Sequence, residues 1–160
     1  MRFAKGKLFF DKEEIRCIPY DESAVDYYAF LKEAMAKGYR QVIVTFEVML
    51  DFITFIYSEK RQKVYKIELM AEDDELETEI KELLRKVDDN PYSISLLIEK
   101  LRFLAEKSSI DIKRVYIKGK YQDGGENYFI QSNGIIGIDE THYAFVTKEI
   151  SAFVKRCLQG

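Results

Sequence analysis

The residues with the clearest chemical potential lie near the C-terminal end, between Tyr121 and Tyr143. This stretch holds four of the eight glycines and the only histidine, His142. Asp139 could orient His142 as a general base, or carboxylates such as Glu126 could join the imidazole in binding a metal. A hydrolase or metal-dependent enzyme built around Asp139 and His142 is therefore one hypothesis.

The same stretch also has a structural interpretation, which its spacing favours. Glycine and asparagine tolerate the positive φ of tight hairpin turns, so 124–125 and 133–134 predict two turns. Asp139 or Thr141 would then cap a following helix. The sequence contains neither a glycine-rich phosphate loop nor paired-cysteine spacing, so it predicts no cofactor and no metal site. These observations together favour a protein that is not an enzyme.

A strand predicted over 113–121 carries the strongest binding signal. Because side chains alternate along a strand, Val115 and Ile117 should share one face, and a basic stripe should occupy the other. That stripe consists of Arg114, Tyr116, Lys118 and Lys120. Cations interleaved with an aromatic ring can bind phosphates and stack a base, so binding of RNA, single-stranded DNA or a nucleotide is a second hypothesis. The structural alternative is a solvated face or a lysine-protected edge.

Other cations would extend this stripe if folding brought them beside it. The candidates are Lys5 and Lys7, or Lys60, Arg61 and Lys63. The whole chain has a formal charge of -3 and a pI near 5.4, which argues against a protein that works mainly by coating nucleic acid. Any such site must be a local basic patch.

Composition predicts one folded, cytoplasmic domain over residues 1–160. The chain is 47% hydrophobic and 33% charged, which excludes disorder. Cys17 and Cys157 lie far apart in the sequence and provide no disulfide framework. The N-terminus lacks a signal-peptide core, and no apolar run approaches the roughly 20 residues of a membrane span. Abundant Lys, Glu and Ile are typical of thermophile proteins.

Periodicity predicts an α+β fold in which mainly antiparallel sheet packs against about four helices, in the order ββ-α-βββ-α-α-βββ-α. A hairpin is expected from the first two strands, followed by a helix that ends near residue 37 and is capped by Asp21 or Ser23. The other strands are predicted at about 41–47, 51–57, 63–70, 110–121, 127–132 and 135–138. The other helices are predicted at about 73–87, from Pro91 onward, and at 141–157.

The segment 46–58 is ambiguous. Its β-branched and aromatic residues favour a strand, and this is the assignment adopted. A helix is the alternative, because Glu47, Asp51, Thr54 and Ser58 are spaced as one polar stripe. With strands here, residues 22–88 and 91–158 each contain an α-βββ-α unit, which suggests an internal duplication.

The leading hypothesis is a non-enzymatic protein-interaction or regulatory module, most simply a homodimer. Phe and Tyr number 22 in total, and such residues are enriched at interfaces. The helix over 72–89 is strongly acidic, whereas the stripe on strand 113–121 is basic, so the chain has patches of opposite charge that could attract a partner. Leu96 and Phe103 give the helix after Pro91 a second apolar side, which predicts that this helix is largely buried. A protein partner or a second copy is therefore expected, nucleic acid is the alternative ligand, and no membrane is involved.

Overall fold

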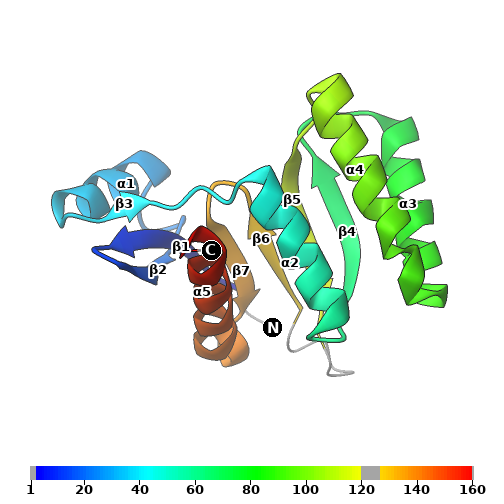
Figure 1. Ribbon diagram of the computed structural model, residues 1–160. Helices are drawn as coiled ribbons and strands as arrows, with labels where there is room; N and C mark the ends of the chain where they lie inside the picture. Colours follow the sequence, from blue (N-terminus) through cyan, green and yellow to red (C-terminus); the bar gives the residue numbers. More distant parts are fainter. Residues whose placement is uncertain (1–2, 120–126, 160) are drawn as a thin grey trace.

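One antiparallel sheet with helices around it forms the protein (Figure 1). The computed structural model describes residues 3–119 and 127–159. The strands are β1 (Phe3–Asp11), β2 (Glu14–Tyr20), β3 (Arg40–Gln41), β4 (Lys63–Leu69), β5 (Ile112–Lys118), β6 (Tyr128–Gln131) and β7 (Ile135–Asp139). They pair in the order β2-β1-β7-β6-β5-β4, with β3 beside β1. The predicted α+β class is confirmed.

Five α-helices of the described chain pack around this sheet. They are α1 (Tyr27–Ala36), α2 (Phe46–Ser58), α3 (Asp74–Asp89), α4 (Ile94–Ser108) and α5 (Tyr143–Gln159), and the short 3-10 turns η1 (Pro91–Ser93) and η2 (Glu140–His142) precede α4 and α5. Helices α2 and α5 lie on one face of the sheet, and α3 and α4 lie at the β4 end (Figure 1). Among these helices, none combines the length and apolar character needed to cross a membrane.

Two hydrophobic clusters hold these elements together. The larger one lies between the sheet and helices α2 and α5, where the rings of Phe52 and Phe153 meet edge to face at 5.6 Å. The smaller one joins α1 to the opposite face of β1 through Phe9 and Phe30. Because the neighbouring residues Leu8 and Phe9 are both fully buried, both faces of β1 are covered at this point.

The prediction of a strand over 51–57 is wrong, because these residues belong to helix α2. Thr45 caps the helix by accepting a hydrogen bond from the amide of Val48 at 3.3 Å. Phe52, Ile53 and Ile56 point into the core, whereas the polar stripe noted in the sequence faces outward. A capped amphipathic helix of 13 residues therefore outweighs the β propensity of the individual side chains, and the predicted strand over 41–47 shrinks to β3.

Two smaller expectations are also corrected. Helix α1 is capped by Asp26, which accepts from the amide of Ala29 at 3.0 Å, rather than by Asp21 or Ser23. The second apolar side of α4 is not buried: within the described chain, Leu96 is 47% and Phe103 53% exposed. Leu97, Leu101 and Leu104 form the buried side of this helix, so one apolar stripe of α4 suffices for the core.

An internal duplication was suggested by the prediction of an α-βββ-α unit in each half of the chain, and this unit is found only in the second half. Residues 91–158 do contain three strands between α4 and α5, but helix α2 replaces the middle strand in 22–88. The duplication itself stays a prediction.

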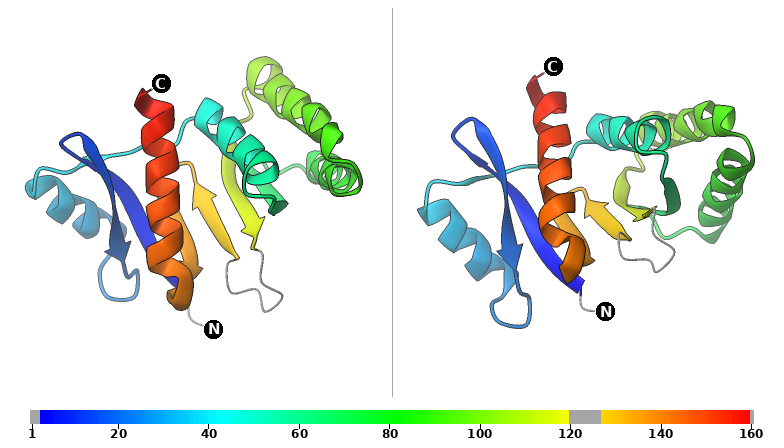
Figure 2. Two further views of the ribbon diagram at one scale, coloured as in Figure 1. Left: turned by 60° about the horizontal axis from the view of Figure 1, so that its bottom comes forward. Right: turned by 90° about the horizontal axis from the view of Figure 1, so that it is seen from below.

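The face of β7, β6 and β5 that is turned away from α2 and α5 carries no helix within the described residues (Figure 2). We call it the open face. Helix α1 borders it on the β1–β2 side, through the small cluster around Phe9. Side chains on this face therefore lie in a shallow region flanked by other elements, where they can meet a ligand.

Candidate functional site

Strand β5 contributes the predicted basic stripe to the open face. Val115 and Ile117 are fully buried in the core, and their neighbours Arg114, Tyr116 and Lys118 alternate to the other side. The fourth predicted member of the stripe, Lys120, lies outside the described residues. The stripe thus has three placed side chains, all on the side of the sheet away from α2 and α5.

An aromatic row crosses three neighbouring strands on this face. Tyr116 of β5 lies opposite Phe129 of β6 in the strand register, and their ring centroids are 5.7 Å apart. On the other side of Tyr116, the ring of Tyr65 from β4 is also 5.7 Å away. Tyr65 is 50% exposed and lies at a register shift in β4, and Nζ of the next residue, Lys66, is 5.4 Å from the ring centroid of Tyr116. The row ends in a ring that solvent, or a ligand, can reach.

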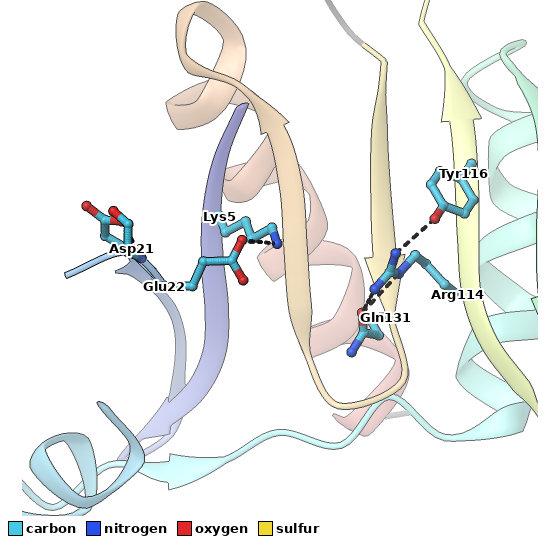
Figure 3. A network of polar contacts seen from close by, with 7 residues as sticks. Lys5, Asp21, Glu22, Arg114, Tyr116 and Gln131 are labelled. Carbon is cyan, nitrogen blue, oxygen red and sulfur yellow. Dashed lines mark hydrogen bonds and ion pairs between the residues drawn. The ribbon is translucent and has the colours of Figure 1, made fainter. Parts of the chain in front are cut away.

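Arg114 is held rigidly beside this row (Figure 3). Its guanidinium carbon lies 4.5 Å from the ring centroid of Phe129, a cation–π contact. Nε donates to Oε1 of Gln131 at 2.9 Å, Nη2 donates to the same oxygen, and Nη1 donates to the hydroxyl of Tyr116 at 2.9 Å. A guanidinium fixed in this way is preorganised for a planar or anionic ligand.

Glu68 is the acidic counterpart of these cations. The hydroxyl of Tyr116 donates to its Oε1 at 2.5 Å, and this hydrogen bond, followed by the charge of Arg114, lowers the pKa of the carboxyl below its ordinary value. Lys66 and Lys113 contribute to the same shift. The lowered pKa reflects first the hydrogen bond from Tyr116 and then the neighbouring cations, and both favour the ionised carboxylate.

Two depressions adjoin one another on the open face and share Lys5 and Phe129. The first, which we call the aromatic pocket, has a volume of about 190 Å³ and is lined by Lys5, Tyr65, Tyr116, Tyr128 and Phe129. The second, which we call the polar cleft, has a volume of about 230 Å³ and is lined by Lys5, Tyr20, Glu22, Tyr27, Arg114, Phe129, Gln131, Asn133 and Ile135.

Charged side chains border the polar cleft from both sides (Figure 3). Lys5 reaches from β1 and Arg114 from β5, over the strands between them. Nζ of Lys5 is paired with Oε1 of Glu22 at 2.8 Å. The cleft therefore has two cations at its borders, one of them already neutralised by a carboxylate from the loop after β2.

A third cation, Lys7, lies buried behind the lining of the polar cleft. Its exposed fraction is 0%, and its Nζ donates to the backbone carbonyl of Asn133. The ammonium also lies 5.9 Å from the ring centroid of Tyr27 and 5.7 Å from that of Phe9. Burial lowers its pKa from 10.5 to about 8, and within the described residues no carboxylate is paired with it.

Gly137 makes the position of Phe129 feasible. The two residues are directly opposite each other on β7 and β6, and the ring lies over the glycine. A β-carbon at Gly137 would be 2.1 Å from Cε2 of Phe129, which is sterically forbidden. The glycine is therefore needed for a side-chain approach, not for a turn.

The structure brings Asp139 and His142 together at the start of η2. Nδ1 of His142 is 3.1 Å from both carboxylate oxygens, and Oδ1 of Asp139 also accepts from the amides of Thr141 and His142 at 3.0 and 3.3 Å. Asp139 is thus a helix cap, as its position in the sequence indicates. Glu126, the other candidate ligand, lies outside the described residues, and no group of three metal-ligating side chains occurs within them.

Sequence reasoning did not include several residues of the open face. Tyr65, Glu68, Phe129 and Gln131 were not assigned, and Lys5 and Lys7 were left without a location. The alternation within the predicted strand 127–132 contains a usable signal, because Tyr128 and Ile130 are apolar and Gln131 is polar on the opposite side. Strands β1 and β5 belong to the same sheet with β7 and β6 between them. No local pattern in the sequence could show this, because the order of the strands depends on contacts between residues far apart in the chain.

Comparisons with protein-family models, with curated proteins and with solved structures find no match for this chain. Without such a match, the fold and the candidate site describe the general class of this protein. It is an α+β protein whose sheet has one face covered by helices and the other lined with aromatic rings and cations.

Proposed function

We propose that this protein binds single-stranded nucleic acid, RNA or DNA, on the open face of its sheet. The observation that carries the proposal is the aromatic row, in which half-exposed Tyr65 and partly exposed Tyr116 offer rings on two adjacent strands, supported by buried Phe129 and beside fixed cations. Every nucleobase has a π face, so rings of this kind bind unpaired bases with little regard to sequence. Tyr65 offers the most accessible ring.

Local charge supports the same ligand, although the chain as a whole is acidic. Cations outnumber acidic residues within β4 and β5, where Glu68 is the only carboxylate of the two strands, although the acidic start of α3 shares a depression with Lys66 and Lys113. The cations are Lys63, Lys66, Lys113, Arg114 and Lys118. Lys63 and Lys118 are direct neighbours in the strand register, where two like charges side by side are unfavourable unless an anion lies near them. A phosphate backbone along these strands would supply that anion.

Replacing Lys118 by glutamine tests the electrostatic part of the proposal. Wild-type protein should bind a fluorescent single-stranded 12-mer of uridine or thymidine less tightly as salt rises. Loss of one phosphate contact should reduce the slope of log affinity against log salt by about 0.7. Fluorescence anisotropy between about 50 and 300 mM salt measures both slopes.

Lys148→Gln is the matched control, because Lys148 is an exposed lysine on α5, on the other face of the sheet. This variant removes the same charge and should keep the wild-type slope. Wild-type protein that retains neither oligonucleotide at low salt would overturn the proposal. Equal slopes for the two variants would locate the binding elsewhere.

A second candidate function is self-association through α4. Within the described chain, the outward side of this helix and the preceding turn exposes Tyr92 at 89%, Leu96 at 47% and Phe103 at 53%. Leu96 and Phe103 are seven residues apart, so they lie on one side of the helix. A second copy is the simplest occupant, because a twofold contact needs only this one patch on each chain.

Phe103→Glu tests self-association. If α4 mediates a dimer, the wild-type protein should have twice the chain mass in light scattering, and the variant should have the mass of one chain, because a buried unpaired carboxylate opposes the contact. Phe145→Glu is the control, since Phe145 is similarly exposed, at 57%, but lies on α5. A monomeric wild-type protein excludes this function and leaves the nucleic-acid proposal intact.

A further inference from the structure

The polar cleft and the aromatic pocket are neighbouring depressions with two different chemistries. Lys5 and Phe129 line both, so a ligand can occupy the two at once. The pocket is bordered by aromatic rings and suits a planar base, and its volume of about 190 Å³ limits it to a group of about that size. The cleft is bordered by Arg114, Lys5 and polar side chains and suits an anion.

Buried Lys7 favours an anion as the ligand of the polar cleft. An ammonium that is withdrawn from water is costly unless an opposite charge lies near it. Besides the ring of Phe9, its partners are the carbonyl of Asn133 and the ring of Tyr27, and these two residues line the cleft. Ile135 of the lining lies beside Lys7 in the strand register. An anion in the cleft would therefore lie near Lys7, separated from it by residues that contact Lys7 and line the cleft.

Arg114 retains the means to bind that anion directly. Its contacts with Gln131 and Tyr116 use three of its five N–H groups, so two remain without a partner among the described residues. A guanidinium with two available N–H groups and a fixed plane matches the oxygens of a phosphate.

The segment after β2 contributes to the lining of the polar cleft. Tyr20, Glu22 and Tyr27 line it where the loop after β2 leads into α1. An oligonucleotide that lies across β4, β5 and β6 reaches these side chains last, so the group considered for the cleft is the one at the end of the oligonucleotide. A terminal phosphomonoester carries more negative charge at pH 7 than a phosphodiester inside a chain, which suits a cleft bordered by several cations.

From this geometry we propose that the polar cleft binds a terminal phosphomonoester whose adjoining base occupies the aromatic pocket. The inference rests on the proposed nucleic-acid function. In the unliganded protein, the carboxylate of Glu22 is paired with Lys5 in the position that the phosphate would compete for. Glu22 thus weakens phosphate binding until it is displaced, and its removal should strengthen binding.

The test compares 3′-labelled thymidine 8-mers with and without a 5′-phosphate, using wild-type protein and Glu22→Gln. In the wild type, the phosphate should increase affinity at least tenfold. In Glu22→Gln the affinity ratio of the phosphorylated to the unphosphorylated strand should be several-fold larger than in the wild type. Glu33→Gln is the control, because Glu33 is an exposed residue of α1 paired with Lys37 and does not line the cleft.

Two failures can be told apart. Equal affinity for both strands in wild type and in Glu22→Gln would overturn the phosphate site and leave the proposed nucleic-acid function standing. Absence of binding to either strand would overturn both. Competition by thymidine 5′-monophosphate distinguishes the two sources of this group: effective competition supports a mononucleotide as the ligand, and competition only by the phosphorylated strand supports a strand end.

Discussion

Lys7→Met is expected to raise the free energy of unfolding by about 2 kcal/mol at pH 7. The wild-type ammonium is fully buried and lacks a carboxylate partner among the described residues, and burial lowers its pKa from 10.5 to about 8. A difference of this size corresponds to about 3 kcal/mol of destabilisation in the charged form. Methionine fills similar space without charge, but it leaves the carbonyl of Asn133 without its donor, which costs about 1 kcal/mol.

The advantage of methionine should disappear at high pH. Between pH 8 and 10.5 the unfolded wild-type chain holds a proton on Lys7 that the folded chain has released, so the contribution of Lys7 to stability improves as pH rises through this window. Below pH 8 both states are protonated and the penalty is present in full. The difference between variant and wild type should therefore be constant up to about pH 8 and then fall.

Urea unfolding followed by circular dichroism at pH 7, 8, 9 and 10 measures this difference. Lys32→Met is the matched control, because it removes the same charge from an exposed position on α1. The difference in free energy of unfolding between Lys32→Met and Lys7→Met is then expected to carry the pH dependence of Lys7 alone. A loss of 2 kcal/mol or more in Lys7→Met at pH 7 would identify Lys7 as a structural anchor instead of a strained, functional cation.

A lysine that destabilises the fold is expected to have a compensating role. Lys7→Met should therefore be more stable than the wild type and should also lose the preference for a 5′-phosphorylated strand. Stability gained together with function lost is the pattern of a binding residue held in an unfavourable environment.

Gly137→Ala is expected to lower the free energy of unfolding by about 2 to 3 kcal/mol, the usual cost of forcing extra volume into a packed site. The new methyl group would lie 2.1 Å from Cε2 of Phe129, so the ring must leave its place between Arg114 and Tyr116. Affinity for single-stranded oligonucleotide should fall about tenfold, because base stacking on aromatic residues is worth about 1 to 3 kcal/mol.

A double-mutant cycle with Phe129→Ala separates the clash from any other effect of the methyl group. In the Phe129→Ala background, Gly137→Ala should be nearly neutral, which gives a coupling energy of about 2 kcal/mol. Equal costs in both backgrounds would show that Gly137 is needed for its backbone and not for the ring above it.

The extent to which sequence predicted the fold depended on the length of each pattern. Strands β4, β5, β6 and β7 and helix α3 were located within a few residues, because their alternation or helical periodicity is strong and their ends carry turn or cap residues. Helix α2 was misassigned because two local signals disagreed. Individual residue preferences favoured a strand, and only burial against the sheet rewards the helical arrangement of Phe52, Ile53 and Ile56.

The candidate site was predicted in part for the same reason. The faces of β5 follow from alternation alone, so Arg114, Tyr116 and Lys118 could be grouped from the sequence. The contacts that give these side chains a geometry come from other strands. Gln131 fixes Arg114, and Glu68 fixes Tyr116, at sequence separations of 17 and 48 residues that no local pattern encodes.

The sequence by itself determined the α+β class, the strand ends marked by the turn at 133–134, the cap at Asp139 and the basic side of β5, because each depends on residues close together in the chain. The tertiary structure decided which side chains become neighbours. Strand order β1-β7-β6-β5 brings Lys5 and Lys7 onto the face that holds Arg114, more than 100 residues away. That order is selected by burial summed over the whole core, so the cleft and the buried ammonium of Lys7 beside it exist only once the sheet is assembled.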